Sequence, residues 1–567
     1  MPVRHGGLVE RKRADRRGMR ADLAVFRGVL ALLSGAVVSL AGGAGRAGRI
    51  SAGSYAVRIN RTEAGIGCRG LEERRSGGGT AVCGGQAGAI DLSAWRGCAR
   101  GDAAIRGRGE AETAGSFGCR SVRVDRNGES AVMKRIKKSD LERYIPLFSI
   151  ILFALIIRLS VFVWVWHIDP LRIMSPDSIT YERPAQVMLH EGLFLHNPFL
   201  DYRTPGYPLF IAASYWLHES RFVLMIFQIL VSVGTIGLLW MIGRRWWGNG
   251  VAILAALLLA FDPASFISSQ KILSETWFTF IFTFMIFAGL MVLENGRLAW
   301  AFGLGFLLAL CAHIRPVALF LIWPVLIGVA VGEWRHGTPW KRIVVLAGII
   351  LAPWILLVCG WQARNWQVTG KPAFCYIGNY NLLFYVAGHT LEMRDGITFD
   401  RAIETIRAEL PDMKGWSVAR MDNEYRERGL RIIRENPWSC FLSYCRGTIK
   451  MMMPAGNDIQ RYFGVMEFSA VRELIRSPLE FLLIWSPWTA VLLIFEGAFM
   501  AVMAWGIGLA AVKIIRRPRE MWLAYVFLIG VVAYIIVLSA GLQGNYRFRV
   551  PIEPILILFS AIGWSRK

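Results

Sequence analysis

Charged residues are scarce in this chain of 567 residues: Asp, Glu, Lys and Arg make up 19%, whereas 54% of the residues are hydrophobic. An ordinary soluble enzyme of this length has more charge, so the composition predicts an integral membrane protein. The formal net charge is +23, but from residue 133 onward the positive residues lie mainly in short gaps between apolar runs. That distribution is typical of membrane topology, and no nucleic-acid partner is expected.

Lysine is almost absent from residues 1–132, where 22 basic residues include only one Lys, against 12 acidic residues. This Gly-, Ala- and Arg-rich extension cannot bury enough apolar surface to offset chain entropy, so we expect disorder. As an alternative to disorder, the apolar run 23–40 could be a signal peptide or a short membrane span. Met133, followed by the basic residues of 134–138 and an apolar run, resembles the usual start of an inner-membrane protein, so the extension is also expected to be a mis-assigned start.

Metal-type spacing is absent from the five cysteines beyond residue 132, which are Cys311, Cys359, Cys375, Cys440 and Cys445. Cys375 is a candidate for a disulfide with Cys440 or Cys445 if the segment is exported. The first-loop histidines lack the i, i+4 spacing of a zinc helix, although a metal site formed by them stays an alternative. These histidines are His167, His190 and His196.

Long hydrophobic runs dominate the rest of the sequence, and a helix needs about 20 apolar residues to cross a bilayer. We expect an all-α membrane bundle of about ten spans: 145–166, 222–243, 250–267, 273–293, 299–312, 315–332, 342–361, 487–512, 521–540 and 548–564. The basic residues fall in alternate gaps, which puts both ends of the protein in the cytoplasm. The stretches 167–221 and 362–486 are then extracytoplasmic.

This topology divides the chain into a membrane catalytic module (133–361, with the first outer loop 167–221), an extracytoplasmic segment (362–486) and C-terminal transmembrane helices (487–567). The apolar piece 207–217 is too short to span and is expected to lie in the outer interface. Segment 399–436 is polar and helix-like up to Asn436-Pro437, and 437–453 is an amphipathic helix resting on the membrane. The segment is expected to be mostly helical, without a separate fold.

Asp177 is the first candidate for chemistry, in the loop that follows the first span. A carboxylate at the mouth of a membrane cavity is suited to take a proton from an acceptor hydroxyl. The alternative is that Asp177 only caps the helix on which Tyr181 and Ala185 follow on one face. Glu182 and Asp169 are weaker carboxylate candidates.

Two further charged residues have alternative explanations. Arg203, in the turn before the interfacial helix, is suited to bind a phosphate at the membrane surface. The alternative is that its guanidinium only snorkels to the membrane–water interface. Glu275 is at the outer end of a span, where an acidic residue also commonly begins a helix. Asn365 and Asn381 either orient the loop after the seventh span or terminate it.

Several separate motifs resemble the GT-C superfamily of polyprenyl-phosphate-sugar-dependent glycosyltransferases, the branch with protein O-mannosyltransferases and lipid A aminoarabinose transferases. In chain order they are Asp177-xxx-Tyr181-xxx-Ala185, Arg203-Thr-Pro-Gly-Tyr-Pro-Leu-Phe210, Leu273-Ser-Glu275, Arg315-Pro316, Pro353-Trp354, Ala363-Arg-Asn365 with Gly370, Gly378-Asn-Tyr-Asn-Leu382 and Asn545-Tyr-Arg-Phe-Arg-Val-Pro551-Ile-Glu-Pro554. Together they cover nearly all of 133–567.

The resemblance implies roles for these positions. Asp177 is similar to the family's first-loop catalytic base, and Glu275 matches an acidic residue at the outer end of a later span. The positions implied for substrate or donor phosphate are Tyr181, Glu182, Arg203, Tyr207, Arg315, Arg547 and Arg549. Two departures stand out: Ser178 replaces the acidic neighbour that many relatives have after the aspartate, and Arg203-Thr-Pro205 replaces a Lys-Pro-Pro turn.

The expected function is that of a bacterial inner-membrane glycosyltransferase acting on the extracytoplasmic side. It would move a sugar, with inversion, from a polyprenyl-phosphate donor to a lipid, polysaccharide or protein acceptor of the cell envelope. No cofactor is expected, and a divalent metal is left open. A transporter or flippase is the alternative, although no repeated half is evident and only Arg158 and Glu496 are clear mid-span charges. A third possibility is a structural or polymer-assembly membrane protein without catalytic activity.

Overall fold

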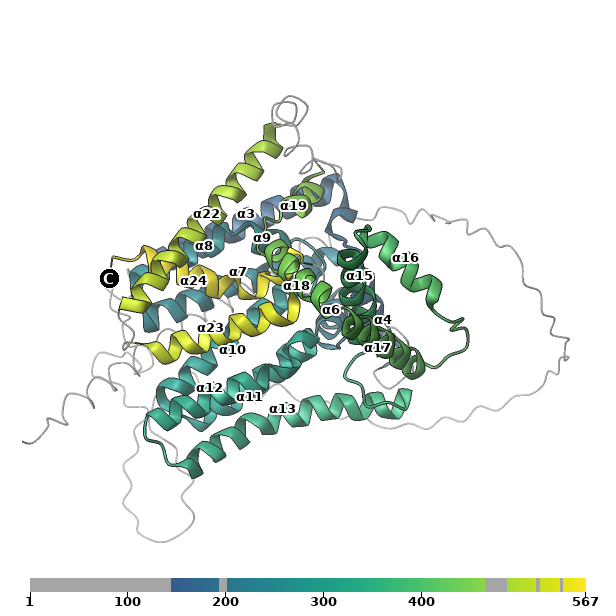
Figure 1. Cartoon of the computed structure of the whole chain (residues 1–567). Coiled ribbons are helices and arrows are strands. Elements are labelled where there is room, and N and C mark those ends of the chain that lie inside the picture. Colours follow the sequence, from purple (N-terminus) through teal and green to yellow (C-terminus); the bar gives the residue numbers. More distant parts are fainter. Residues whose placement is uncertain (1–143, 193–200, 465–486, 517–520, 541–543, 567) are drawn as a thin grey trace, which may run out of the picture. The chain divides into compact units, whose positions relative to one another are not determined.

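The computed structural model describes residues 144–192, 201–464, 487–516, 521–540 and 544–566, which belong to one unit of the chain (Figure 1). These residues form helices and no β-strand, which confirms the all-helical prediction. The extension 1–132, the apolar run 23–40 and the start at Met133 lie outside the described residues.

Seven helices among the described residues are long and apolar enough to cross a bilayer, and a bent pair would make an eighth. The spanning helices are α3 (Ile145–Ile168), α7 (Arg221–Trp246), α10 (Glu275–Asn295), η3 (Pro316–Leu321) with α12 (Ile322–Arg335), α13 (Trp340–Thr369), α22 (Pro487–Arg516) and α23 (Trp522–Ser539). The bent pair is α8 (Asn249–Phe261) and α9 (Pro263–Ser269), which meet at 56°.

Two of the ten predicted spans are shorter than a bilayer requires. The helix α11 (Leu298–Ile314) has 17 residues and α24 (Glu553–Trp564) has 12. At 1.5 Å per residue they reach about 26 and 18 Å, against roughly 30 Å of hydrocarbon. Both still pack inside the bundle, α11 against α10 and α13, and α24 against α22 and α8. Seven or eight spans are supported by length and composition, and the remaining two stay predictions.

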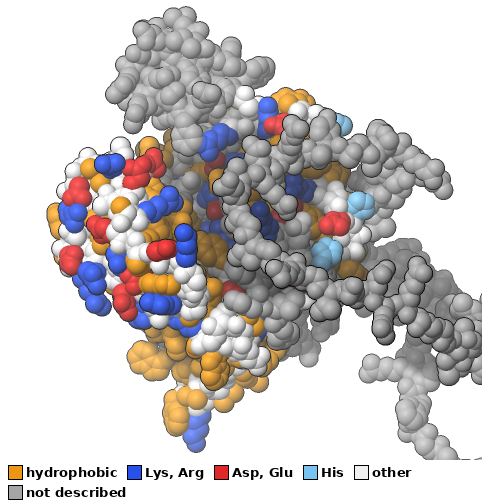
Figure 2. Space-filling model, turned by 90° about the vertical axis from the view of Figure 1, so that its right-hand side faces the viewer, with side chains coloured by type: hydrophobic (Ala, Val, Ile, Leu, Met, Phe, Trp, Pro, Cys, Tyr) orange, Lys and Arg blue, Asp and Glu red, His pale blue; other side chains and the backbone are white. Residues whose placement is uncertain are grey.

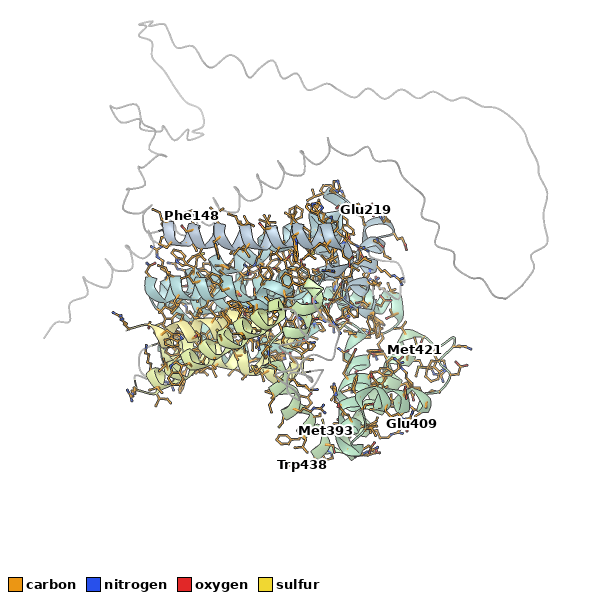
Figure 3. All side chains as sticks on the ribbon, turned by 90° about the horizontal axis from the view of Figure 1, so that it is seen from above. Phe148, Glu219, Met393, Glu409, Met421 and Trp438 are labelled. Carbon is orange, nitrogen blue, oxygen red and sulfur yellow. The ribbon has the colours of Figure 1, made fainter. Side chains whose placement is uncertain are left out.

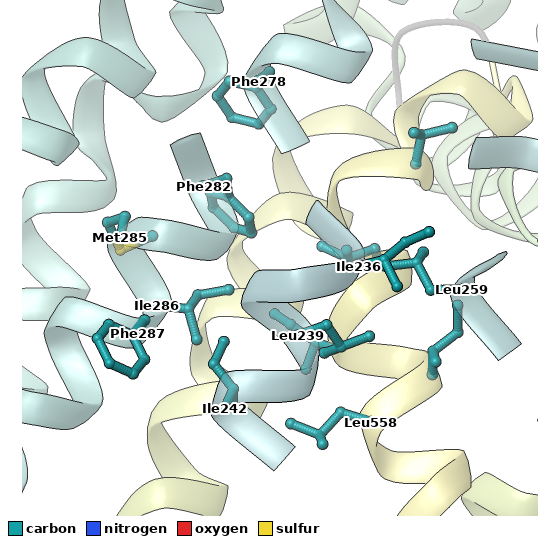
Figure 4. Close-up of a cluster of buried hydrophobic side chains, with 14 of the residues drawn as sticks. Ile236, Leu239, Ile242, Leu259, Phe278, Phe282, Met285, Ile286, Phe287 and Leu558 are labelled. Carbon is teal, nitrogen blue, oxygen red and sulfur yellow. The ribbon is translucent and has the colours of Figure 1, made fainter. Parts of the chain in front are cut away.

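The core of the bundle is formed by interlocked apolar side chains from α7, α8, α10 and α24 (Figure 4). Ile236, Phe278, Phe282 and Leu558 have no more than 1% of their surface exposed, and the rings of Phe278 and Phe282 stack at 5.4 Å. Because lipid is as apolar as these side chains, close packing rather than hydrophobic burial holds such helices together.

Glycine allows two of the helices to approach closely. A Cβ placed on Gly305 of α11 would lie 1.9 Å from the carbonyl oxygen of Ile350 in α13 and 2.9 Å from the ring of Pro353. Any larger residue at Gly305 would force the two backbones apart, since a small residue is what permits this contact. The packing of the long helix α13 against α11 therefore includes one close backbone contact with little tolerance.

Shorter helices gather at one end of the bundle. They are η2 (Pro170–Ile173), α4 (Ser178–His190), α6 (Gly206–Leu217), α14 (Ile377–Asn381), the π-helix η4 (Leu382–Ala387), α15 (Gly388–Asp395), α16 (Phe399–Glu409), α17 (Val418–Glu435), α18 (Pro437–Met451), α19 (Gly456–Phe463), η5 (Tyr546–Phe548) and η6 (Val550–Ile552). The short helix expected at 207–217 and the one expected at 437–453 are present. The polar segment 399–436 is two helices, because residues 410–417, with Pro411, interrupt it.

The surface changes character along the molecule. Large apolar side chains such as Trp164, Leu356 and Ile494 are at least half exposed on the spanning helices, as lipid-facing residues are. In Figure 3, Phe148 of α3 lies at the edge of the bundle, whereas Glu409 and Met421 lie in the part formed by the shorter helices. Figure 2 shows Lys, Arg, Asp and Glu side chains interspersed on one part of its face and hydrophobic ones below them.

Candidate active site

A cavity of about 340 Å³ lies where the shorter helices meet the bundle. Its charged lining consists of Asp177, Arg203, Arg315 and Arg547. We call it the arginine cavity. The lining residues come from the start of α4, the segment before α6, the residues between α11 and η3, and η5, so the site is assembled from distant parts of the chain.

The charged residues of the arginine cavity form one continuous row with Glu275. Arg203 Nη2 lies 2.9 Å from Asp177 Oδ1, and Arg547 Nη2 lies 3.1 Å from Asp177 Oδ2. Arg547 Nε then contacts Glu275 Oε1 at 2.9 Å, and Arg315 Nη1 lies 3.2 Å from the same oxygen. Three arginines thus alternate with two carboxylates, which leaves a formal excess of one positive charge.

Asp177 occupies the N-cap position of α4, but its carboxylate accepts no capping hydrogen bond. The neighbouring Ser178 stabilises the turn before α4 instead. Its hydroxyl accepts a hydrogen bond from the backbone N–H of Ser175 and donates one to the carbonyl of Ile272. The alternative that Asp177 merely caps the helix is therefore wrong for its side chain. That side chain is 38% exposed, which leaves it accessible from the cavity.

The electrostatics of Asp177 and Arg547 are coupled. Burial alone would raise the pKa of the Asp177 carboxyl, but Arg203 and Arg547 hold it below its ordinary value. Burial alone would lower the pKa of the Arg547 guanidinium, but Glu275 and Asp177 raise it above its ordinary value. Both groups are therefore ionised at neutral pH.

Glu275 is the first residue of α10, as the helix-start alternative predicted, and it also joins the row of charges. Its side chain is 1% exposed, and its Oε2 has no hydrogen-bond partner among the described residues. A buried carboxylate needs paired cations to stay ionised, and Arg315 and Arg547 provide them. Glu275 therefore holds two arginines in place rather than facing the open part of the cavity.

Arg203 is held by its own segment and by α4. Its Nε donates to Thr180 Oγ1 at 3.1 Å, and its guanidinium lies over the ring of Tyr181, 4.6 Å from the centroid. The segment is anchored by a buried ion pair between Asp201 and Arg364. Arg364 lies in the last turns of α13, so the C-terminal end of this long helix fixes the segment that carries Arg203.

Two predicted substrate-binding residues do not reach the cavity. Glu182 forms a bidentate pair with Arg221, both contacts at 2.7 Å, and accepts a hydrogen bond from Tyr215. This pair ties α4 to α6 and α7. Tyr207 is fully buried behind Tyr181, and its hydroxyl donates to Gln228 at 2.8 Å. Both side chains stabilise the packing of the helices around the site.

Arg549 is likewise away from the cavity. Its side chain is 1% exposed, pairs with Glu553 and donates to the carbonyl of Met453 at 3.0 Å. The mid-span charges that favoured a transporter are also bound internally. Arg158 donates to the carbonyl of Ala260, and Glu496 accepts from the backbone N–H of Ala455. These two residues contact different helices and do not converge on the arginine cavity.

The sequence singled out Tyr181 but not the other tyrosines that line the cavity. Tyr202, Tyr380 and Tyr385 form one group, in which the rings of Tyr202 and Tyr380 meet edge to face at 5.9 Å. Tyr380 lies within the motif 378–382, but no local pattern links it to Tyr202. Burial raises the pKa of the Tyr202 hydroxyl, so this group stays neutral. Neutral aromatic faces next to a row of arginines are suited to contact a sugar ring.

The opposite part of the cavity is apolar and reaches the outside of the bundle. Phe320 of η3 and Leu538 of α23 both line the cavity and are 58% and 39% exposed. The two elements are joined by a hydrogen bond of 2.7 Å from Tyr534 to the carbonyl of Val317. An apolar chain in the bilayer could therefore approach the arginines sideways, between η3 and α23.

Metal and disulfide chemistry have little support in the part of the chain that the structure describes. It contains no group of three or more His, Cys, Asp and Glu residues that could hold a metal ion, and His196 lies outside it. The expected pairing of Cys375 with Cys440 or Cys445 is absent, because all three thiols are free. Burial raises the pKa of the Cys375 thiol to about 12.

Comparison with known proteins gives one family and a set of loose structural likenesses. Residues 202–361 match the model of the family described as dolichyl-phosphate-mannose-protein mannosyltransferase, a range that includes Arg203, Glu275 and Arg315. No curated protein matches the sequence.

Two solved structures illustrate the structural likenesses. The apo oligosaccharyltransferase of Archaeoglobus fulgidus is 13% identical, with 75% of this chain and 51% of that chain covered and a TM-score of 0.44. ArnT from Cupriavidus metallidurans bound to undecaprenyl phosphate is 16% identical, with 72% and 77% covered and a TM-score of 0.31. The chain spans about half the length of the archaeal structures it matches. At such TM-scores no residue is equated between the chains.

Proposed function

We propose that this chain is a membrane glycosyltransferase that transfers a sugar from a polyprenyl-phosphate donor to a hydroxyl of a cell-envelope acceptor, a proposal in keeping with the match of residues 202–361 to a mannosyltransferase family model. The observation that carries the proposal is the row of three arginines and two carboxylates in a cavity with an apolar side. The arginines supply phosphate contacts, and the side between η3 and α23 admits the lipid chain.

The charges of the row match each stage of the reaction. A sugar linked to polyprenyl phosphate carries one negative charge, which balances the single excess positive charge of the cavity. As the acceptor oxygen bonds to the anomeric carbon, the bond from that carbon to the phosphate oxygen breaks and polyprenyl phosphate leaves with a second negative charge. The acceptor proton passes to Asp177, which loses its charge and leaves the row with an excess of two. Stabilising charge that develops during the reaction is the most effective form of catalysis available to fixed arginines.

Asp177 acts as the base in this scheme, although its pairing with Arg203 and Arg547 makes it a weak base in the free enzyme. The donor phosphate competes with the Asp177 carboxylate for the same two guanidinium groups. Once the phosphate takes them, the carboxylate loses its partners and becomes more basic. Donor binding thus raises the basicity of Asp177 before the transfer step. A single displacement of this kind inverts the anomeric centre.

The pH profiles of the enzyme are expected to separate these two states of Asp177. The acid limb of kcat/KM reports the free enzyme, in which the pKa of Asp177 is below its ordinary 3.8. The acid limb of kcat reports the complex, in which the arginines have turned to the phosphate and the pKa is higher. As pH falls, kcat should therefore decline at a higher pH than kcat/KM. Steady-state kinetics from pH 3 to 8 (roughly the range of carboxyl titration) would check this, and coincident limbs would contradict it.

The remaining assignments belong to the same proposal. The acceptor side would be extracytoplasmic, in a bacterial inner membrane with both chain ends in the cytoplasm, and the three arginines would stabilise the leaving phosphate without a metal. Tyr202, Tyr380 and Tyr385 would contact the sugar.

The direct test compares cells that lack the full chain with cells that produce it. Mass spectrometry of lipid-linked sugars and envelope glycans is expected to show one polyprenyl-phosphate sugar depleted and one glycan modification gained when the chain is present. Depletion without a new glycan would favour a flippase. If the lipid-linked sugars and the envelope glycans are both unchanged, in cells whose donors are detectable, the proposal is wrong.

A further inference from the structure

A second cavity, of about 950 Å³, lies at the other end of the spanning helices. Helix α10 connects the two sites: Glu275 at its start belongs to the arginine cavity, and Glu294 near its end lines the second one. At 1.5 Å per residue these positions are about 28 Å apart, close to the thickness of a bilayer core. The second cavity is therefore near the opposite membrane surface.

The lining of this cavity is amphipathic. Leu290 and Leu293 of α10 and Leu523 of α23 form its apolar part, and Trp246, Trp334 and Trp522 contribute indole rings. Trp334 is 71% exposed, so it is open to whatever surrounds the bundle. Tryptophan is enriched at headgroup level, where one side of the ring is apolar and the other is wet.

The charged side chains that line the cavity are those of Arg245, Glu294 and Arg335. Arg245 forms a bidentate pair with Glu294, at 2.6 and 2.9 Å, and both line the cavity. Arg335 lies over the ring of Trp522, 4.0 Å from its centroid, and makes no ion pair within the described residues. The nearby Glu333 is buried, and it accepts a hydrogen bond from Thr338. Arg335 is thus held in position by an aromatic ring while its donors stay available.

We propose that this cavity binds the phosphate of an anionic phospholipid, with Arg335 as its principal contact and with Trp334 and Leu523 against the first carbons of an acyl chain. Basic pockets between transmembrane helices near the membrane surface are suited to anionic headgroups. The exposed ring of Trp334 distinguishes this ligand from a soluble phosphate, which would leave that apolar surface uncovered. The proposal is independent of the transferase mechanism, because no residue is shared between the two cavities.

The test is native mass spectrometry of the full chain in detergent, titrated with phosphatidylglycerol or with phosphatidylcholine of the same acyl chains. Phosphatidylglycerol is expected to bind more tightly, and Arg335→Gln to weaken it about fivefold, since one surface arginine contributes about 1 kcal/mol to anionic lipid binding. Arg335→Lys keeps the charge and should retain most of the affinity. Arg297→Gln is the matched control, because Arg297 is exposed, follows α10 at the same end and does not line the cavity.

Three results would overturn the proposal. Equal binding of the two lipids would remove the role of charge, and equal loss with Arg297→Gln would remove the cavity as its location. Competition by glycerol phosphate at the same concentration as the lipid would show that a soluble phosphate suffices. Binding that depends on acyl chains, on the anionic headgroup and on Arg335 is the outcome that supports it.

Discussion

Asp177→Asn is expected to lower kcat for sugar transfer by about 10²- to 10⁴-fold, the usual contribution of a positioned general base. Asparagine has the same shape but accepts no proton. It also releases Arg203 and Arg547 from a competing carboxylate. The KM for the donor should therefore stay the same or fall while kcat collapses. A transfer assay with purified protein and the lipid-linked donor named by the cellular test would measure both constants.

Asp169→Asn is the matched control for this substitution. Asp169 lies in the same loop, accepts a hydrogen bond from the backbone N–H of Leu171 and does not line the cavity. Its removal should leave kcat within about threefold, because its partners are Leu171 and Arg172 of the short helix η2, which do not line the cavity. A decline of kcat in the Asp169 variant comparable to that of Asp177→Asn would mean that the loop, rather than the base, limits the reaction.

Asp201→Ala is expected to destabilise the protein by about 3–5 kcal/mol, since it leaves the Arg364 guanidinium buried without its carboxylate. The side chains of this pair are 0% and 4% exposed. Glu404→Ala is the control: it removes one partner of the pair with Arg401, whose side chains are 65% and 71% exposed. An exposed pair contributes about 1 kcal/mol at most. Chemical unfolding in detergent would compare the two.

The Asp201 variant should also affect donor binding, because Asp201 anchors the segment that carries Arg203. The expected signature is an increase in KM for the donor at temperatures where the variant is still folded. Asp201→Glu, which keeps the charge, should recover part of both losses. If Asp201→Ala and Glu404→Ala have equal effects, the buried pair is not what fixes the segment.

The sequence was sufficient for the helical fold because runs of apolar residues are a local property. Apolar length alone does not decide the number of spans, because α11 and α24 are apolar but have only 17 and 12 residues.

The site residues could be recognised by type but not by partner. Asp177 and Glu182 are both carboxylates of the first loop, yet five residues on a helix place them on different faces, whereas Tyr181 follows Asp177 at i+4. Arg547 and Arg549 likewise diverge on a 3₁₀ turn, where two residues differ by about 240°. Helical periodicity could therefore have shown that Glu182 and Arg549 point away from Asp177 and Arg547. The pairing of Asp177 with Arg547 could not be anticipated, because the two residues are 370 positions apart in the sequence.

That long separation also sets the order in which the site is completed during synthesis. Asp177, Arg203, Glu275 and Arg315 all leave the ribosome well before Arg547. Until η5 is in place, the row contains as many carboxylates as arginines, and its net charge is zero. A partly synthesised chain therefore has no electrostatic preference for a phosphate, and under the proposed function it would not engage a lipid-linked sugar until η5 is in place.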